Sequence, residues 1–130
     1  MFKIERVKEN KTTKAIYFTK DSNIFKNNKS LEISIYYSLG GYSLGGYSQR
    51  GYYISLEPCK LGNNSVTSYP FDGIRYFLKE VNRQSKRQFN EAIKSVTFET
   101  LSGLSAHMGF SLSDKELDFI LKSIQDQFID

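Results

Sequence analysis

Apolar and polar residues alternate along much of the first 70 positions of this chain. From Leu31 to Ser38 and from Tyr52 to Glu57, every second residue is apolar and most residues between them are polar. Strict alternation is typical of an antiparallel strand with one buried face. Pro58 then ends the second strand or marks a sheet edge. Further strands are expected at residues 2–5, 15–19 and 66–69.

The spacing of apolar residues changes after position 70 and follows steps of three and four, which is typical of one helix face. Pro70 and Asp72 lie where residues that favour a helix start are expected. The pattern therefore predicts one long helix over about 72–96, with a candidate break at Gln84-Ser85. The apolar positions are Ile74, Phe77, Leu78, Val81, Phe89, Ala92, Ile93 and Val96.

Two shorter helices are expected in the C-terminal third of the chain. The first spans 97–108, has Gly103 in its interior and is followed by Gly109, a residue type that often caps helix ends. The second begins with a capping box formed by Ser113 and Glu116, and it continues with apolar residues at helical spacing.

Strands followed by helices indicate an α+β fold rather than alternating βαβ units. We expect an antiparallel sheet of four or five strands in residues 1–70, covered by the long helix, with a C-terminal helix pair alongside. A chain of 130 residues suffices for a single domain. Within it, we expect the sheet and long helix in 1–96 and a helical appendage in 97–130.

The composition excludes several classes of protein. An apolar content of 39% with 15% aromatic residues is too high for a disordered chain. One Cys and one His cannot form an internal disulfide or a usual structural zinc site. No apolar run reaches the roughly 18 residues of a membrane helix, and charges interrupt the N-terminus where a signal peptide is apolar. We therefore expect a soluble, cytoplasmic protein with no membrane partner, no metal and no cofactor.

The most unusual segment is an internal repeat with a five-residue period, in which Tyr-Ser-Leu-Gly-Gly starts at Tyr37 and again at Tyr42. Six of the nine tyrosines lie between residues 36 and 53, and five of the nine glycines lie between 40 and 51. Because the segment joins the two clearest strands, we expect a long hairpin loop over 38–51. The candidate partner-binding residues are Tyr42, Tyr47, Arg50, Tyr52 and Tyr53.

Three interpretations of this loop stay open. Tyrosines that stack on bases, with Arg50 on a phosphate or a base plane, fit a nucleic acid. Tyrosine, serine and glycine are also the residues that protein-binding loops use. The third interpretation is a hairpin tip without a function. A phosphate-cradling glycine loop does not fit, because the segment precedes a strand rather than a helix.

The expected long helix carries a second candidate site, a stripe of basic residues. At 100° per residue, their side chains fall within an arc of about 120°, mostly opposite the apolar face. The stripe suits a phosphate backbone or an acidic protein surface. An ordinary solvated face, or a contact with the acidic last helix, explains it without a function. The members are Arg75, Lys79, Arg83, Lys86, Arg87 and Lys94.

No set of residues indicates catalysis. His107 has no Cys, Asp or Glu at a ligand spacing, and Cys59 has no nearby His. Glu32 and Glu57 meet across the hairpin only if the strand register brings them together, and surface positions are the default for both. An enzyme would need a cleft that perturbs His107 or Glu57. We therefore expect a protein that is not an enzyme.

Four segments carry a resemblance: Ile33 to Tyr37 with Gly40-Gly41, the run Arg50 to Ser55, the triplet Phe71-Asp-Gly, and the run Asn82 to Arg87. Over about residues 31–93, the chain resembles small accessory proteins carried by phages and conjugative elements of low-GC Gram-positive bacteria. The resemblance implies an inhibitor of host defence, including the anti-CRISPR type, and it carries no catalytic residue.

Two functions are consistent with these observations. The first is a non-enzymatic binding protein that inhibits a host protein, such as a nucleic-acid-handling defence nuclease or its nucleic-acid complex. The alternative is a direct DNA- or RNA-binding protein, which would use the tyrosine loop for stacking and the basic helix for phosphates.

Overall fold

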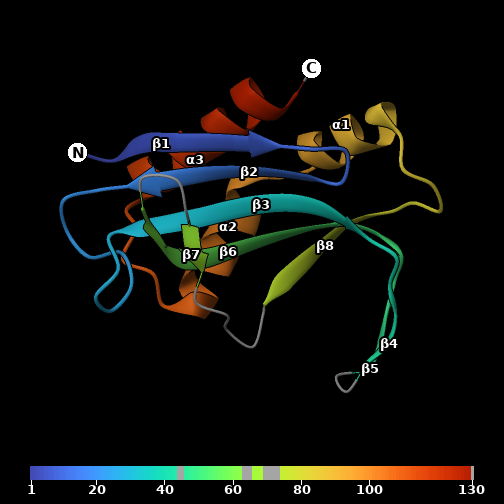
Figure 1. Cartoon of the computed structure of the whole chain (residues 1–130), viewed down its shortest axis with the longest axis horizontal. Coiled ribbons are helices and arrows are strands. Elements are labelled where there is room, and N and C mark those ends of the chain that lie inside the picture. Colours follow the sequence, from blue (N-terminus) through green and yellow to red (C-terminus); the bar gives the residue numbers. More distant parts are fainter. Residues whose placement is uncertain (44–45, 63–65, 69–73, 130) are drawn as a thin grey trace.

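The computed structural model describes residues 1–43, 46–62, 66–68 and 74–129. In this part of the chain, eight strands precede three helices (Figure 1). The strands are β1 (Lys3–Glu9), β2 (Thr13–Thr19), β3 (Ser30–Ser38), β4 (Gly41–Ser43), β5 (Gly46–Ser48), β6 (Gly51–Leu61), β7 (Val66–Ser68) and β8 (Arg75–Glu80). The helices are α1 (Lys86–Lys94), α2 (Phe98–Met108) and α3 (Asp114–Phe128).

The main sheet is antiparallel throughout, with β1, β2, β3 and β6 as neighbours in that order. Both β7 and β8 pair with the edge of β6 that faces away from β3. β7 pairs with residues 59–61 of β6 and β8 with residues 51–55, so the two short strands share the fifth position of the sheet. The expected α+β fold with an antiparallel sheet is therefore confirmed.

All three helices lie on one face of the main sheet (Figure 1). The alternating residues of the strands explain this, because the apolar members such as Ile16, Ile33 and Ile54 are fully buried on that face. They share one core with residues of all three helices, including Phe89 of α1 and Phe128 of α3. The C-terminal helix pair therefore belongs to the same core as the sheet.

The prediction of one long helix over about 72–96 is wrong. Residues 75–80 form strand β8, and the helix covers only 86–94, starting after the N-cap Ser85 at the candidate break. Pro70 and residues 72–73 lie outside the described residues. The segment Arg75–Glu80 carries apolar residues in a pattern that fits both periods, and pairing with β6 decides in favour of a strand.

The prediction that Pro58 ends a strand or marks an edge is answered by the register of β6. The strand continues to Leu61, and Pro58 lies opposite Leu31 of β3. On the other edge of β6, the pairing with β8 ends at Ser55 and the pairing with β7 begins at Cys59, so Pro58 lies in the gap between these partners. A residue without an N–H is tolerated in a strand where an edge is unpaired.

Helix α2 ends, and helix α3 begins, where the sequence predicts. Gly109 caps α2 with φ of +76°, a left-handed conformation that glycine adopts at little cost. The capping box of α3 is present, because the Glu116 N–H donates to Ser113 Oγ at 3.2 Å and the Ser113 N–H donates to Glu116 Oε1 at 2.8 Å. Gly103 lies inside α2 because a Cβ there would be 2.9 Å from the Tyr76 hydroxyl oxygen of β8.

Candidate functional site

The expected hairpin loop contains a second, two-stranded antiparallel sheet, which we call the tyrosine ribbon (residues 39–50 where described). Gly41 pairs with Ser48 and Tyr42 with Tyr47. The ribbon extends the β3–β6 hairpin and bends away from the main sheet (Figure 1). The repeat explains this arrangement, because it places Gly40, Gly41 and Gly46 at positive φ values of +69°, +115° and +104°.

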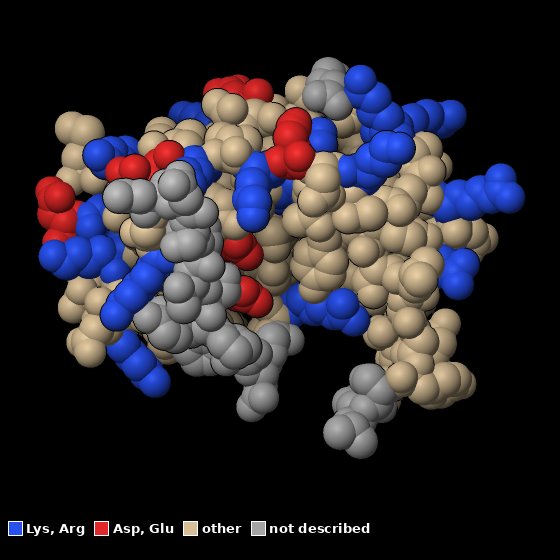
Figure 2. Space-filling view, in the orientation of Figure 1, with Lys and Arg blue, Asp and Glu red and all other residues tan. Residues whose placement is uncertain are grey.

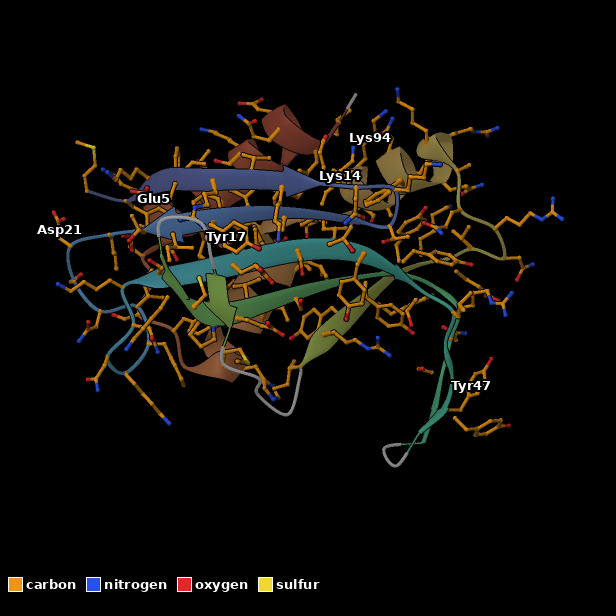
Figure 3. All side chains as sticks on the ribbon, viewed as in Figure 1. Glu5, Lys14, Tyr17, Asp21, Tyr47 and Lys94 are labelled. Atoms are coloured by element: carbon orange, nitrogen blue, oxygen red, sulfur yellow. The ribbon has the colours of Figure 1, made fainter. Side chains whose placement is uncertain are left out.

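Two tyrosines of the repeat form an exposed aromatic pair on the ribbon. Tyr42 is 89% exposed and Tyr47 is 66% exposed, and their ring centroids are 5.3 Å apart. Figure 3 shows the Tyr47 side chain at the far end of the molecule from Tyr17 and Asp21. Leu39 is also 68% exposed. These residues form an accessible apolar surface on a projecting element.

The base of the ribbon is held by short-range contacts. The Arg50 Nε donates a hydrogen bond to the Leu39 carbonyl oxygen at 3.2 Å, although the Arg50 side chain is largely exposed. A Cβ at Gly40 would lie 2.5 Å from the Ser48 carbonyl oxygen, so the two strands approach too closely there for a larger residue. Arg50 therefore stabilises the base of the ribbon and is also an accessible cation there.

The prediction that Tyr52 and Tyr53 bind a partner is contradicted by their burial. Tyr52 is fully buried on the helix face, with its ring centroid 4.7 Å from that of Phe89. Tyr53 is 5% exposed on the opposite face, where the Arg75 guanidinium lies 3.9 Å from its ring centroid. Alternation along β6 places the two rings on opposite faces of the sheet, and each packs against other side chains there. Tyr42 and Tyr47 are therefore the accessible tyrosines of the predicted set.

The predicted basic helix stripe does not exist as one surface. Arg75 and Lys79 belong to β8, and Arg83 lies in the segment before α1. Arg75 covers Tyr53 on one face, whereas Lys79 Nζ pairs with the α1 residue Glu91 at 3.2 Å on the other. On α1, Lys86, Arg87 and Lys94 are exposed.

Several basic side chains nevertheless lie together at the α1 end of the molecule. In Figure 2, Lys and Arg side chains lie over the end that α1 and the preceding segment occupy in Figure 1, and also over the opposite end, where acidic side chains accompany them. The β1–β2 turn, which holds Lys11, reaches the same end (Figure 1). The basic end therefore combines residues that are far apart in the sequence.

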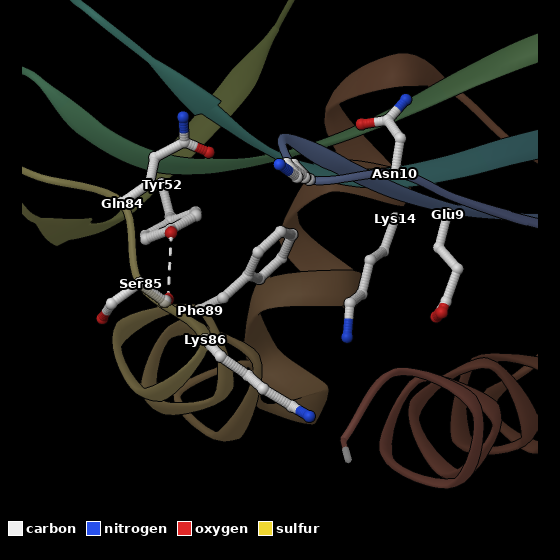
Figure 4. A pocket seen from close by; sticks show the side chains of 9 residues that line it. Glu9, Asn10, Lys14, Tyr52, Gln84, Ser85, Lys86 and Phe89 are labelled. Atoms are coloured by element: carbon white, nitrogen blue, oxygen red, sulfur yellow. Dashed lines mark hydrogen bonds between the residues drawn. The ribbon is translucent and has the colours of Figure 1, made fainter.

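A pocket of about 610 Å³ opens at this end, which we call the basic-end pocket. It lies between the β1–β2 turn, β6 and the N-terminal end of α1 (Figure 4). Its lining residues are Glu9, Asn10, Lys11, Lys14, Tyr52, Gln84, Ser85, Lys86 and Phe89. Volumes of 300–1,000 Å³ are typical of small-molecule sites.

Lys14 is the most constrained charged group of the pocket. It is only 7% exposed, because strand alternation places it on the same face as Ile16 and Phe18. Its ammonium donates a hydrogen bond to the Phe128 carbonyl oxygen at 2.6 Å and lies 5.2 Å from the Phe89 ring centroid. These contacts hold a positive charge at the inner wall of the pocket.

The sheet face opposite the helices carries a row of polar residues that sequence reasoning left open. Tyr17, Glu32 and Glu57 are direct neighbours across β2, β3 and β6, so the two carboxylates do meet. Burial and then the Glu32 carboxylate raise the pKa of Glu57 above its ordinary value. Burial, a hydrogen bond to Glu32 and the charge of Glu32 raise the pKa of Tyr17.

The remaining candidates for chemistry are inert or isolated. Cys59 is buried, and burial followed by the charge of Glu32 raises the pKa of its thiol to about 12, so it stays protonated at neutral pH. His107 is exposed near the end of α2. Within the described ranges, no three His, Cys, Asp or Glu residues gather as metal ligands would. None of the described helices is long and apolar enough to cross a membrane.

Sequence reasoning missed the basic-end pocket as a site. Its walls come from residues 9–14, Tyr52 and 84–89, and only the tertiary fold brings these segments together. One signal was present in the sequence. Lys14 occupies an inward position of an alternating strand, and a lysine at such a position needs a local reason.

Comparisons with protein-family models, with curated proteins and with solved structures found no match for this chain. The function is therefore argued from the ribbon and the basic end themselves.

Proposed function

We propose that this chain is a non-enzymatic binding protein that captures another protein through the tyrosine ribbon. The observation that carries the proposal is the exposed pair of Tyr42 and Tyr47 on an element that projects from the sheet. Large aromatic side chains in contact with water lose the favourable free energy of burial. A partner that covers both rings restores that free energy.

The composition of the ribbon supports a protein partner. Tyrosine offers a large contact area with few rotatable bonds, and serine and glycine allow the backbone to adapt to a partner. Binding energy in protein interfaces is concentrated in a few aromatic and arginine residues. Tyr42, Tyr47 and Arg50 supply this set on one ribbon. The complementary surface would hold an apolar pocket with an acidic group at its rim.

The resemblance to accessory proteins of phages and conjugative elements extends the proposal to the partner. Under it, the captured protein is a component of host defence, such as a nuclease that handles nucleic acids, and binding inhibits that protein. Stoichiometric inhibition requires only a stable contact surface, so it is consistent with a buried, protonated Cys59 and an exposed, isolated His107.

The test is affinity capture from a bacterial host lysate, followed by calorimetry with the purified captured protein. We compare the wild type with the double variant Tyr42→Ser/Tyr47→Ser. The variant should bind at least about 100-fold more weakly, because each aromatic anchor typically contributes about 2 kcal/mol or more. Both rings are exposed, so the thermal unfolding midpoint should stay within error of the wild type.

A matched control removes exposed apolar surface elsewhere. Val7 is 41% exposed on the edge strand β1, and Val7→Ser should leave the affinity for the captured protein unchanged. Equal capture by the wild type and the tyrosine double variant would rule out the ribbon as the contact surface.

Direct nucleic-acid binding is the second candidate function, and the gathering of basic side chains at one end favours it. Polarisation titrations with labelled single-stranded DNA, duplex DNA and RNA at two salt concentrations test it. Phosphate contacts would make the affinity fall steeply with salt. Neutralising Arg83 and Arg87, both exposed, should then weaken binding for every sequence and flatten the salt dependence.

A further inference from the structure

The helix-free face of the main sheet, which is turned toward the viewer in Figures 1 and 2, carries a groove between aromatic and acidic side chains. On this face, three side chains of β3 lie opposite three of β6 in successive cross-strand pairs. The pairs are Glu32–Glu57, Ser34–Ser55 and Tyr36–Tyr53. The two serines are the smallest of these side chains, so the surface is lowest between the carboxylates and the tyrosines. We call this depression the sheet-face groove.

The aromatic side of the groove is connected to the tyrosine ribbon. Tyr36 and Tyr53 stack with their ring centroids 6.1 Å apart, and the Phe77 ring of β8 lies 5.2 Å from that of Tyr53. The Tyr53 hydroxyl donates a hydrogen bond to the Gln49 carbonyl oxygen of the ribbon. Phe77 is itself 40% exposed. The groove is therefore continuous with the surface that we propose for capture.

The acidic side of the groove has no compensating positive charge. Glu32 and Glu57 are half-buried, and within the described ranges no lysine or arginine forms an ion pair with either of them. The pKa of Glu57 is raised by burial and then by the charge of Glu32, and no cation lowers it. Arg75 is held on the aromatic side, where its guanidinium lies 3.9 Å from the Tyr53 ring centroid and donates to the Tyr36 hydroxyl at 3.4 Å. A cation from a partner would therefore be favoured beside the two carboxylates.

A cavity of about 300 Å³ opens from the groove toward the β1–β2 turn. Two of its lining residues, Glu9 and Glu32, are carboxylates, and one, Lys8 on the edge strand β1, is an exposed cation. This volume is at the lower end of the range for small-molecule sites, so it accommodates one long side chain rather than a folded element. The lining residues are Lys8, Glu9, Asn10, Thr13, Ala15, Tyr17, Glu32 and Ser34.

From this geometry we propose that the sheet-face groove binds an arginine side chain of the protein that the tyrosine ribbon captures. The guanidinium would pair with Glu32 and Glu57, and the arginine stem would lie over Ser34 and Ser55 and against Tyr36. A guanidinium donates paired hydrogen bonds to carboxylates and stacks on aromatic rings, which a lysine ammonium does not do. This inference rests on the proposed function and names the chemistry of the partner, an exposed arginine beside the apolar surface that covers the ribbon.

The first test uses a small probe and needs no captured protein. The isotope-labelled full chain is titrated with N-acetylarginine amide and with N-acetylcitrulline amide, its uncharged isostere, and the backbone amide signals are followed by NMR. The arginine probe should shift the signals of residues 32–36 and 53–57, and the citrulline probe should leave them unchanged. Equal shifts with both probes, or no shift in these segments, would overturn the proposal.

The second test measures the affinity for the captured protein by calorimetry at two salt concentrations. Glu57→Gln should weaken binding about tenfold, because a hydrogen bond between charged groups is lost. It should also reduce the dependence on salt. The same change removes the repulsion between Glu32 and Glu57, so it should not lower the unfolding midpoint. Weaker binding by a fold of undiminished stability therefore reports a lost contact rather than a structural defect.

Glu99→Gln is the matched control for this measurement. Glu99 is exposed on α2, on the opposite side of the sheet, so the loss of its charge should leave the affinity unchanged. Equal affinities and equal salt dependence in Glu57→Gln and the wild type would overturn the groove as a contact.

Failure of the groove and failure of the ribbon are distinguishable. The variant Tyr42→Ser/Tyr47→Ser should keep the shifts caused by the arginine probe, because neither tyrosine lines the groove or its cavity. Capture that is lost in the tyrosine variant and unchanged in Glu57→Gln rejects only the groove. Capture that is unchanged in the tyrosine variant and weakened in Glu57→Gln rejects only the ribbon.

Discussion

Glu32 and Glu57 lie directly opposite each other on neighbouring central strands. Like charges at such a position destabilise a sheet. This destabilisation is reflected in the pKa of Glu57, which is raised first by burial and then by the charge of Glu32. Tyr17, on the next strand, donates its hydroxyl hydrogen to Glu32 and so reduces the repulsion between the two carboxylates. Polar residues on this face therefore form a cross-strand row rather than separate surface groups.

The carboxyl of Glu57 makes the stability of the fold depend on pH. Its pKa is raised above its ordinary value of 4.5, so the folded protein holds this proton more tightly than the unfolded chain does. The contribution to stability is fully present below about pH 4.5 and is lost as the pH rises through the raised pKa. Glu57→Gln should therefore stabilise the protein at pH 7, by about 0.2–1 kcal/mol, and should remove this part of the pH dependence.

Urea unfolding at several pH values between 4 and 8 measures this effect. Glu80→Gln is the control, because Glu80 is an exposed carboxylate on β8, and surface changes of this kind usually stay within about 0.5 kcal/mol. A Glu57→Gln variant that is less stable than the wild type at pH 7 would contradict the interpretation.

Gly51 is required by the close approach of two backbones. Its φ is +154°, and a Cβ there would collide with the Lys79 carbonyl oxygen of β8. The collision involves main-chain atoms, which cannot rotate away. Gly51→Ala should therefore destabilise the fold by at least about 2 kcal/mol. Gly109→Ala is the comparison, since φ there is +76° but no heavy atom lies within 4 Å, and only the strain of about 1–2 kcal/mol remains.

Differential scanning calorimetry of the two glycine variants separates collision from strain. The unfolding midpoint of Gly51→Ala should fall further than that of Gly109→Ala. The reverse order would mean that β8 does not pass as close to Gly51 as the pairing of Gly51 with Glu80 requires.

At the scale of the elements, the sequence predicted both helix α3 and the position where it begins, because the signals for both are local. The Ser113–Glu116 capping box and the following apolar stripe act within one helix, and the structure contains both. The strands of the main sheet were predictable for the same reason, since alternation needs no partner to be recognised. The segment 75–80 was assigned to a helix because its apolar residues continue the spacing of α1. Only pairing with Gly51–Ser55 of β6 makes it a strand.

The apolar faces of α1 and α3 should dominate the stability of these elements. Phe89 is 5% exposed and packs on Tyr52, and Leu117 is 4% exposed in the same core. Phe89→Ala and Leu117→Ala should each cost about 2–5 kcal/mol, because a cavity remains after truncation. Denaturant unfolding monitored by circular dichroism gives the values. Stabilities near that of the wild type for both variants would contradict the helix packing.

For the whole molecule, the two candidate surfaces differ in how far the sequence could reveal them. The tyrosine ribbon is encoded by a local repeat, so Tyr42 and Tyr47 were found, although burial removed Tyr52 and Tyr53 from the set. The basic-end pocket joins the β1–β2 turn to the start of α1, which are about 70 residues apart in the chain. A helical wheel drawn through β8 could not group Lys86 with Lys11 and Lys14.

The position of the tyrosine ribbon leads to one prediction for the whole chain. Ser38 pairs with Gly51 at the last position of the β3–β6 ladder, so replacing residues 39–50 by Asn-Gly closes the hairpin with a two-residue turn. The ribbon strands pair with each other and not with the main sheet, and the change removes only the hydrogen bonds that the Arg50 and Gln49 carbonyls accept from Val81 and Tyr53, so the unfolding midpoint should fall by only a few degrees. This variant should lose protein capture.

Capture assays and calorimetry on the same preparation decide the outcome. Retained protein capture would show that the exposed tyrosines are a hairpin tip without a binding role. Loss of capture with a nearly unchanged unfolding midpoint is the result that a projecting contact surface requires.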